Sequence, residues 1–491
     1  MASPEEILPI VDYLIDLSCC PRCILRFLGQ HAKETFYLNP KEYFNSLIMT
    51  GDKDPQENIK KLKSNVCPVC LDCYKDSTIE KITEQLKTLD LESYDYSNFF
   101  FNVSFPKCIA VRAHSILLHL KNKFPNYRFG NLYETTSNEN VPLLEPPHKI
   151  FRVISSKALS EVLNRPCHPK SQLSLLICLG YEDDDIEVKN LKDIINNTKK
   201  NQHIRISRNN IPEFLKETDE KMFKSRFSVP PEIPNTPVSI VNIEINAEPL
   251  FLGGRYFKFK RNVGQTPWIK DGQSVTDYNV QDEVFKAVSS VLGFDYNSMT
   301  FTASGREDVD VRMLGTGRPF YIKIDNPKRR KFLQEDLHKI ERMVIQSELV
   351  AITNLQTVPE SELRRIKHGE EQKRKTYKAI CKTTCPNVKE AISVINKHGE
   401  SQLNVTQLTV MRVLHRRTLL PRNKIIYHMT AEEIPGHSDL FELVMVTQAG
   451  AYVKEFVHGD FKRTQPNISS LIGYPTDMIA LDCIDIDLAW P

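Results

Sequence analysis

The stretch FTASGREDVDVRMLGTGRPF, residues 301–320, combines glycines, arginines and carboxylates within twenty positions. Glycine lets the backbone adopt conformations closed to other residues and approach a ligand closely. The arginines carry planar forks suited to phosphate; they are Arg306, Arg312 and Arg318. Asp308 and Asp310 lie among them, with Glu307 beside them. The pattern indicates either a reactive carboxylate beside an anionic polymer or a surface turn whose charges are solvated.

The composition is that of a folded protein without an export or membrane segment. With 491 residues and 41% hydrophobic side chains, the chain can build two to four packed domains. A net charge of +3 means that any nucleic-acid surface must be local. The opening MASPEEILPI is acidic where a secretory signal is basic, and no apolar run reaches the ~20 residues of a membrane span. We expect an intracellular protein of the nucleus or cytoplasm.

Two CPxC turns lie among the twelve cysteines. Each turn presents two thiolates on one side of a metal, which is the geometry of a tetrahedral structural zinc site. The expected ligands are Cys20, Cys23, Cys67 and Cys70. Cys19 and Cys73 are adjacent and could substitute for one of them. The alternative is a set of unrelated buried thiols. No histidine or water-holding acid stands at ligand spacing, so the zinc would be structural.

Hydrophobic periodicity predicts an α+β protein of three parts. The expected helices span residues 5–17, 111–124, 281–292 and 332–352. The expected strands span residues 99–105, 150–155, 173–179 and 238–246. A Lys- and Asn-rich segment, residues 189–224, is followed by four closely spaced prolines and predicts a linker. The domains expected are a zinc module (1–78), an accessory RNA-binding domain (79–225) and a catalytic domain (226–491).

Four further stretches of the second half carry basic or aromatic residues. GGRYFKFKR, residues 253–261, predicts a strand with basic side chains partly on one face and aromatic ones on the other. It contains Arg255, a candidate phosphate contact. KTYKA (375–379), RVLHRR (412–417) and QAGAYVKEFVHGDF (448–461) follow it. A segment with three arginines and a histidine in six residues suits RNA backbone better than a core.

The tetrad Gly305-Arg306-Glu307-Asp308 resembles the G-R-x-D element of pseudouridine synthases. The longer run is similar to the tRNA pseudouridine synthase ten family of archaea and eukaryotes, and all five motifs occur in that family's order. The two CxxC pairs extend the resemblance to the first half. The chain departs from the family at Val410-Met411, where Pro and an apolar residue are usual, and at Ala451, where Thr is usual.

The resemblance implies a fold and a set of site residues. The fold is a catalytic domain on a mixed, mainly antiparallel sheet flanked by helices, plus an N-terminal α/β region with a zinc site and a THUMP-type RNA-binding domain. Asp308 would be the catalytic carboxylate, Tyr377 would pack on the target uracil, and Lys454 would pair with Asp308. The expected substrate contacts are Arg306, Arg255, Tyr452, Arg312, Arg318, Arg412, His415 and Arg416.

The same resemblance implies isomerisation of uridine to pseudouridine in the T arm of tRNA, at position 54, 55 or both. The base must be flipped out of the RNA to react. We expect tRNA as partner, structural zinc, no organic cofactor and a monomer. The alternative is a tRNA-binding chaperone without chemistry, for which Asp308 would be dispensable. A deaminase is disfavoured because Cys67-Pro-Val-Cys70 has no H-x-E partner.

Overall fold

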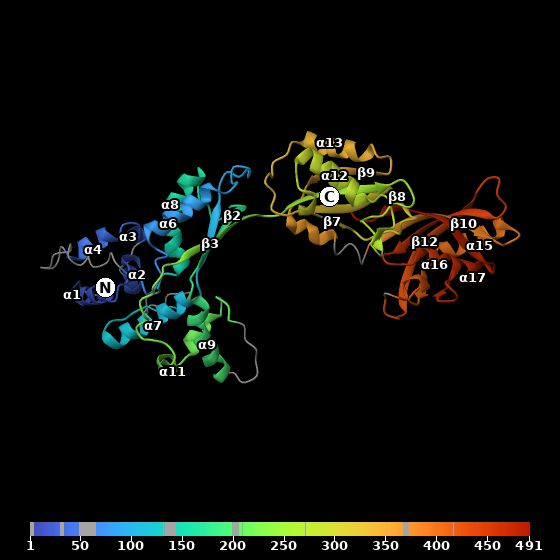
Figure 1. Cartoon of the computed structure of the whole chain (residues 1–491). Coiled ribbons are helices and arrows are strands. Elements are labelled where there is room, and N and C mark those ends of the chain that lie inside the picture. Colours follow the sequence, from blue (N-terminus) through green and yellow to red (C-terminus); the bar gives the residue numbers. More distant parts are fainter. Residues whose placement is uncertain are drawn as a thin grey trace. The chain divides into compact units, whose positions relative to one another are not determined.

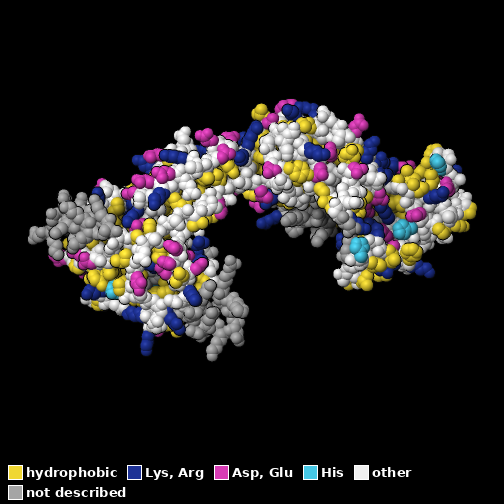
Figure 2. All heavy atoms as spheres, viewed as in Figure 1, with side chains coloured by type: hydrophobic (Ala, Val, Ile, Leu, Met, Phe, Trp, Pro, Cys, Tyr) yellow, Lys and Arg dark blue, Asp and Glu magenta, His cyan; other side chains and the backbone are white. Residues whose placement is uncertain are grey.

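The computed structural model describes residues 4–29, 34–48, 65–130, 132, 144–198, 206–208, 210–270, 272–366, 373–415 and 417–491. The chain forms two compact units, Met1–Ala247 and Glu248–Pro491, labelled by their elements in Figure 1. On the face shown in Figure 2, Lys and Arg side chains are interspersed with Asp and Glu on both units. None of the helices that the structure describes has the length and apolar character of a bilayer span.

The first unit packs helices around a three-stranded sheet. Its strands are β1 (Phe100–Ser104), β2 (Leu173–Gly180) and β3 (Ser239–Ala247), with β1 parallel and β3 antiparallel to the central β2. Its helices are α1 (Pro4–Asp16), α2 (Pro21–Leu28), α3 (Glu34–Leu38), α4 (Pro40–Ile48), α6 (Asp76–Lys87), α7 (Cys108–Lys123), α8 (Pro147–Leu163), α9 (Asp184–Thr198), α10 (Ile211–Glu217) and α11 (Glu220–Lys224). On β2 every second side chain is buried, as alternation predicts.

Three expectations for this unit need correction. Residues 150–155, expected as a strand, lie inside α8, where Ile150, Phe151 and Ile154 are buried at helical spacing. A six-residue apolar window cannot separate a strand from one face of a longer helix. The described residues of the segment 189–224 are mostly helical, and α10 and α11 bury apolar side chains in this unit's core. β3, expected in the catalytic domain, pairs with β2 of the first unit.

The second unit is built on one ten-stranded sheet. Its strand order is β14-β11-β12-β13-β10-β15-β8-β4-β9, with β7 paired to β8. The strands are β4 (Leu250–Lys258), β7 (Met299–Ala303), β8 (Arg312–Ile324), β9 (Val350–Thr357), β10 (Arg374–Thr383), β11 (Leu403–Gln407), β12 (Arg422–Glu433), β13 (Leu440–Gln448), β14 (Thr464–Gln465) and β15 (Thr476–Ile486). Only β15 and β8 pair in parallel among the described pairings of this sheet. The mixed, mainly antiparallel sheet confirms the predicted α+β fold.

Helices cover the two halves of this sheet separately. α12 (Val280–Leu292) and α13 (Gln334–Ile345) pack with β9, whereas α15 (Val388–Gly399) packs with β12, and α16 (Val453–His458) and α17 (Ile468–Ile472) pack with β15. Each half has its own hydrophobic core, and Tyr377 is a partly buried side chain packed against both. The short hairpin β5 (Ile269–Lys270) and β6 (Gln273–Ser274) lies outside the sheet. The parallel β15–β8 pairing therefore marks the junction of two half-sheets.

Candidate active site

The loop between β7 and β8, residues 304–311, lies at this junction. Gly305 has a φ of +80°, and a Cβ there would come within 3.1 Å of Lys375 Nζ and 3.2 Å of Arg318 Nη1. The backbone conformation therefore favours glycine, and an added side chain would have to displace one of these two groups. The backbone N–H of Val311 donates to the carbonyl of Asp308 at 3.1 Å, which closes the turn around that residue.

Glu307 points inward from this loop into a buried ion cluster. Its side chain is 2% exposed and lies 2.8 Å from Arg318 Nε and 3.5 Å from Lys258 Nζ. The Tyr256 hydroxyl donates to the same carboxylate at 2.8 Å. Burial alone would raise the pKa of Glu307, but Arg318 and Lys258 hold that pKa below its usual value. Glu307 is therefore an ionised, paired acid inside the protein.

The partners of Glu307 also hold the loop's backbone. Lys258 Nζ donates to the carbonyl of Asp308 at 3.0 Å, and Arg318 Nη1 donates to that of Ser304 at 2.8 Å. Gln265 Nε2 donates to the carbonyl of Gly305 at 2.9 Å. Three carbonyls of one short loop are thus satisfied by side chains from β4, β8 and the segment after β4. Fixing the backbone on both sides of Glu307 fixes the direction in which Asp308 points.

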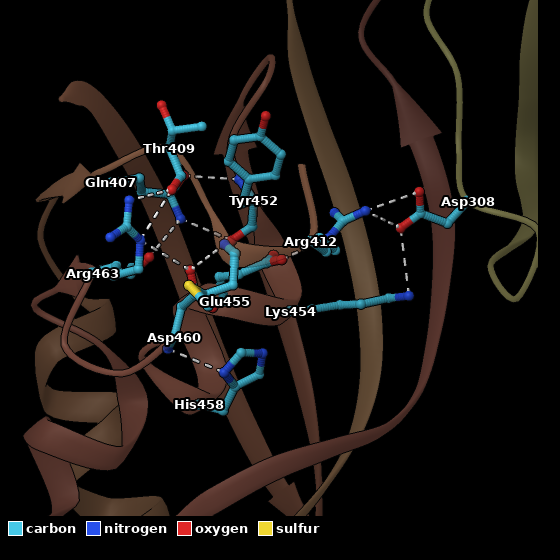
Figure 3. Close-up of polar contacts among 12 residues, drawn as sticks. Asp308, Gln407, Thr409, Arg412, Tyr452, Lys454, Glu455, His458, Asp460 and Arg463 are labelled. Carbon is cyan, nitrogen blue, oxygen red and sulfur yellow. Dashed lines mark hydrogen bonds and ion pairs between the residues drawn. The ribbon is translucent and has the colours of Figure 1, made fainter. Parts of the chain in front are cut away.

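Asp308 carries its carboxylate outward onto two cations. Its side chain is 41% exposed, and Arg412 Nη1 lies 3.0 Å from Oδ2 and donates to Oδ1 at 3.2 Å. Lys454 Nζ lies 3.5 Å from Oδ2 (Figure 3). Arg412 comes from the 3-10 turn Met411–Val413 and Lys454 from the first turn of α16. Two segments that lie more than a hundred residues beyond Asp308 in the sequence thus meet at this acid.

Arg412 is itself anchored on its other side. Its Nε donates to Glu455 Oε1 at 2.6 Å, and that carboxylate is almost fully buried. Its guanidinium also lies over the ring of Tyr452, 5.5 Å from the centroid. Tyr452 is held in turn by Gln407, which exchanges two hydrogen bonds with its backbone at 2.8 and 2.9 Å (Figure 3). Arg412 is therefore a bridge between a buried acid and Asp308.

Asp310 is the closest acidic partner of Lys454. Lys454 Nζ lies 2.8 Å from Oδ1 and 2.7 Å from Oδ2 of Asp310, nearer than the 3.5 Å that separates it from Asp308 Oδ2. Partial burial raises the pKa of Asp310, whereas the hydrogen bond and charge of Lys454 lower it, with a net shift below its usual value. Lys454 is thus shared between two carboxylates.

Tyr377 on β10 lies in a row of cross-strand neighbours that crosses the junction between β15 and β8. It is opposite Cys483 of β15, which is in turn opposite Met313 of β8. Burial raises the pKa of the Tyr377 phenol, and the charge of Asp308 adds to this shift. Tyr377 therefore stays neutral, and Asp308 is close enough to act on it electrostatically. The structure brings Asp308, Lys454 and Tyr377 into the same part of the second unit.

Three of the expected phosphate contacts are engaged within the protein instead. Arg255 donates to the backbone carbonyls of Thr316, Gly317, Leu488 and Trp490. Arg312 pairs with Asp482, and Arg318 is buried with Glu307. Lys258 on β4 is buried too, so the expected separation of basic and aromatic faces on that strand is wrong. The guanidinium groups of these three arginines are therefore bound within the protein.

Arg306 and His415, two further expected RNA contacts, are exposed, and Arg416 lies outside the described residues.

Residue spacing did not identify two acids that organise the site, Glu307 and Glu455. Their only mark in the sequence is that each directly neighbours a residue singled out for chemistry, Asp308 or Lys454. In a turn or in the first turn of a helix, consecutive side chains can point in different directions. Glu307 and Glu455 therefore point into the core although their neighbours Asp308 and Lys454 are partly exposed.

Four buried cysteines of the first unit form a candidate metal centre. The Sγ atoms of Cys20, Cys23, Cys67 and Cys70 all lie within 4.8 Å of one another. Cys20 Sγ and Cys70 Sγ are 3.6 Å apart, close to the ~3.8 Å expected between sulfurs around tetrahedral zinc with bonds of ~2.3 Å. The backbone N–H of Cys20 also donates to Cys67 Sγ at 3.3 Å. The donor set fits zinc, without Cys19 or Cys73 in the cluster.

Comparisons with known proteins cover both units. The family described as "Pus10, C-terminal" matches residues 251–487, and "Eukaryotic Pus10, N-terminal" matches residues 67–245. The "tRNA pseudouridine synthase Pus10" of Homo sapiens is 31% identical over 538 residues, covering 99% of this chain and 98% of that protein. The protein of the same description from Thermofilum pendens is 34% identical over 249 residues, covering 50% of this chain and 54% of its own length. A solved "Cbf5-Nop10-Gar1 Complex" is similar at 15% identity over 48% of each chain, with a TM-score of 0.27.

Proposed function

Since the chain belongs to the Pus10 family, we propose that it is a pseudouridine synthase, an isomerase that converts a uridine in the T arm of tRNA to pseudouridine. One observation carries the assignment of the site: a half-exposed carboxylate, Asp308, held by Arg412 and Lys454. Its backbone is fixed by buried side chains, so the carboxylate is positioned before substrate arrives. The positions proposed for the target are the adjacent uridines 54 and 55.

Asp308 supplies the covalent or proton chemistry. The bond from uracil N1 to ribose C1′ breaks, the base turns in place, and a bond from C5 to C1′ forms. The C5 proton leaves and N1 gains one, so the reaction needs no oxidant or organic cofactor. Asp308 acts either as a nucleophile at the ribose or as a base that removes a ribose proton. In both roles Arg412 and Lys454 hold the carboxylate in place through their contacts with its oxygens.

The remaining residues bind and present the uridine. Flipping the base costs a few kcal/mol, which stacking and backbone contacts must offset. Tyr377 packs on the flipped uracil, and its neutral phenol keeps that surface uncharged. Arg306 and His415, both exposed, contact the RNA backbone, and the same role is proposed for Arg416, which lies outside the described residues. The first unit, with its structural zinc, serves as a THUMP-like RNA-binding region, and the protein acts as an intracellular monomer.

The test measures tritium release from a tRNA transcript labelled at uracil C5. We expect release by the wild type, none by Asp308→Asn, and release within about tenfold of wild type by the matched variant Asp310→Asn, because Asp310 is bound mainly by Lys454. If Asp310→Asn releases no tritium and Asp308→Asn still does, the catalytic carboxylate is Asp310 and not Asp308. Tight tRNA binding with no release by the wild type would favour the chaperone alternative.

A further inference from the structure

The turn that follows α16 has an unusual backbone and an unusual side chain. Gly459, Asp460, Phe461 and Lys462 have φ values of +82°, +47°, +56° and +71°. Three consecutive non-glycine residues in the left-handed region cost free energy, and such strain persists only where surrounding contacts impose it. The turn places Phe461 in solvent, where its side chain is 88% exposed.

The neighbouring segment imposes this conformation. Asp460 is buried, and its Oδ2 accepts from the backbone N–H of Met411 at 3.0 Å. Arg463 Nε donates to the carbonyl of Thr409 at 3.0 Å, and the backbone N–H of Leu408 donates to the carbonyl of Arg463 at 2.8 Å. Figure 3 shows Asp460, Arg463 and Thr409 beside the site residues. The residues on both sides of Phe461 are therefore held by the same segment that carries Arg412.

The segments 408–420 and 458–463 expose a set of apolar side chains, which we call the Phe461 surface. Its members are Leu408, Met411, Leu419, Leu420 and Phe461. Thr409 ties the far end of the segment in place, because its hydroxyl donates to the carbonyl of Thr418 at 2.6 Å and accepts from the backbone N–H of Leu420 at 3.1 Å. The apolar side chains thus belong to one connected structure.

The two segments that carry the Phe461 surface are rich in basic residues. Residues 408–420 contain three arginines, a histidine and no acid. In residues 458–463 the one acid is Asp460, which is buried and accepts from Met411, while Lys462 is exposed. An exposed aromatic ring among cations, with the local acid turned inward, complements a polyanion that has unstacked bases. A second copy of the chain would bring the same positive charge to the contact.

We propose that Phe461 stacks on an unpaired nucleobase of the RNA substrate, close to the uridine presented to Asp308. The inference rests on the proposed function for the identity of the RNA. Its location follows from the contacts: Asp460 binds Met411, and the next residue, Arg412, binds Asp308. A base held on Phe461 stays out of its helix, which keeps the RNA open while the target uridine is displaced.

Binding is measured in an Asp308→Asn background, so that it is separated from chemistry. Fluorescence anisotropy with a labelled tRNA transcript compares Phe461→Ala, Phe461→Trp and the control Leu333→Ala, another exposed apolar residue of the second unit. We expect Phe461→Ala to weaken binding by about 5- to 100-fold, the range for loss of one base–aromatic stack. Phe461→Trp and Leu333→Ala should bind as the parent does. Because Phe461 is exposed, Phe461→Ala should keep the parent's unfolding midpoint.

The salt dependence identifies stacking. Phe461→Ala should leave the slope of log affinity against log salt unchanged, whereas Lys462→Ala should reduce it by about 0.7, the value for one phosphate contact of a single strand. Parent-like binding by Phe461→Ala would overturn the proposal. A shift from dimer to monomer in Phe461→Ala, seen by sedimentation, would also overturn it in favour of a contact between copies. If Phe461→Ala weakens binding but the wild type releases no tritium, Phe461 remains an RNA contact and the proposed synthase activity is wrong.

Discussion

Arg412 bridges Asp308 to the protein interior: Nη1 lies 3.0 Å from Asp308 Oδ2, and Nε donates to the buried Glu455 at 2.6 Å. Burial lowers the pKa of Arg412, but Glu455 and Asp308 raise it to a net value above the usual one. The guanidinium is therefore a fixed positive charge with two acceptors at defined directions. A lysine has one donor group at the end of its side chain and cannot reach both acids in this arrangement.

We therefore predict that Arg412→Lys keeps the charge but loses activity. Loss of one charge-assisted hydrogen bond of ~1.5–3 kcal/mol corresponds to a single-turnover rate of tritium release lower by about 10- to 100-fold. The matched control is Arg417→Lys, an exposed arginine in the same segment. Equal rates for Arg412→Lys and the control would show that the bridge to Glu455 has no effect on Asp308.

The chemistry of the loop could be predicted from the sequence better than its supporting contacts. Gly305 and Asp308 are recognisable because both belong to the tetrad that resembles the G-R-x-D element, and the structure gives Gly305 the positive φ that favours glycine. Arg306 and Arg318 are not distinguishable in the sequence, yet one is exposed and the other is buried with Glu307. Which arginine faces inward depends on strand register, and register is set by pairings distant in sequence.

The sequence also could not predict which cation pairs with which carboxylate, because these pairs too form between residues distant in sequence. Arg412 lies 104 residues from Asp308, and no local spacing reports that separation. The sequence predicted Lys454 as the partner of Asp308, but the distances are shorter to Asp310. In the fold, the mostly apolar run LSLLICLG of β2 was sufficient to predict a strand, whereas the window at residues 150–155 was too short to reveal α8.

Glu307→Gln should destabilise the second unit. It leaves Arg318 buried without its counter-charge, and breaking a buried ion pair in this way costs about 3–5 kcal/mol. The chain's two tryptophans, Trp268 and Trp490, both lie in this unit, and Trp490 is buried. Tryptophan fluorescence in a urea titration therefore reports its unfolding selectively.

The double variant Glu307→Gln/Arg318→Met gives the control, because it removes both charges. We expect it to be more stable than Glu307→Gln alone, so that the two changes are far from additive. Additive losses of stability in the same titration would mean that the pair at 2.8 Å contributes no coupling.

The stability of the second unit should also depend on acid pH through Glu307. Arg318 and Lys258 hold the folded pKa of Glu307 below its unfolded value of about 4.3. A depressed pKa contributes stability that is present above the unfolded value and is lost as pH falls through the folded one. The urea midpoint of the wild type should therefore fall with decreasing pH below about 4.3, and that of Glu307→Gln should fall less. Asp310→Asn, a control at a more exposed acid, should follow the wild type more closely.

Cys67→Ser should remove the metal from the first unit and leave the second unit unchanged. Four buried sulfurs within 4.8 Å fit one zinc ion, and structural zinc contributes about 10 kcal/mol or more to small zinc domains. Elemental analysis of purified protein should give about one zinc per chain for the wild type and none for Cys67→Ser. Its first unit should become sensitive to protease, while the tryptophan unfolding transition stays in place. Cys73→Ser changes an equally buried cysteine outside the cluster and should retain zinc; loss of zinc in this variant would assign the fourth ligand differently.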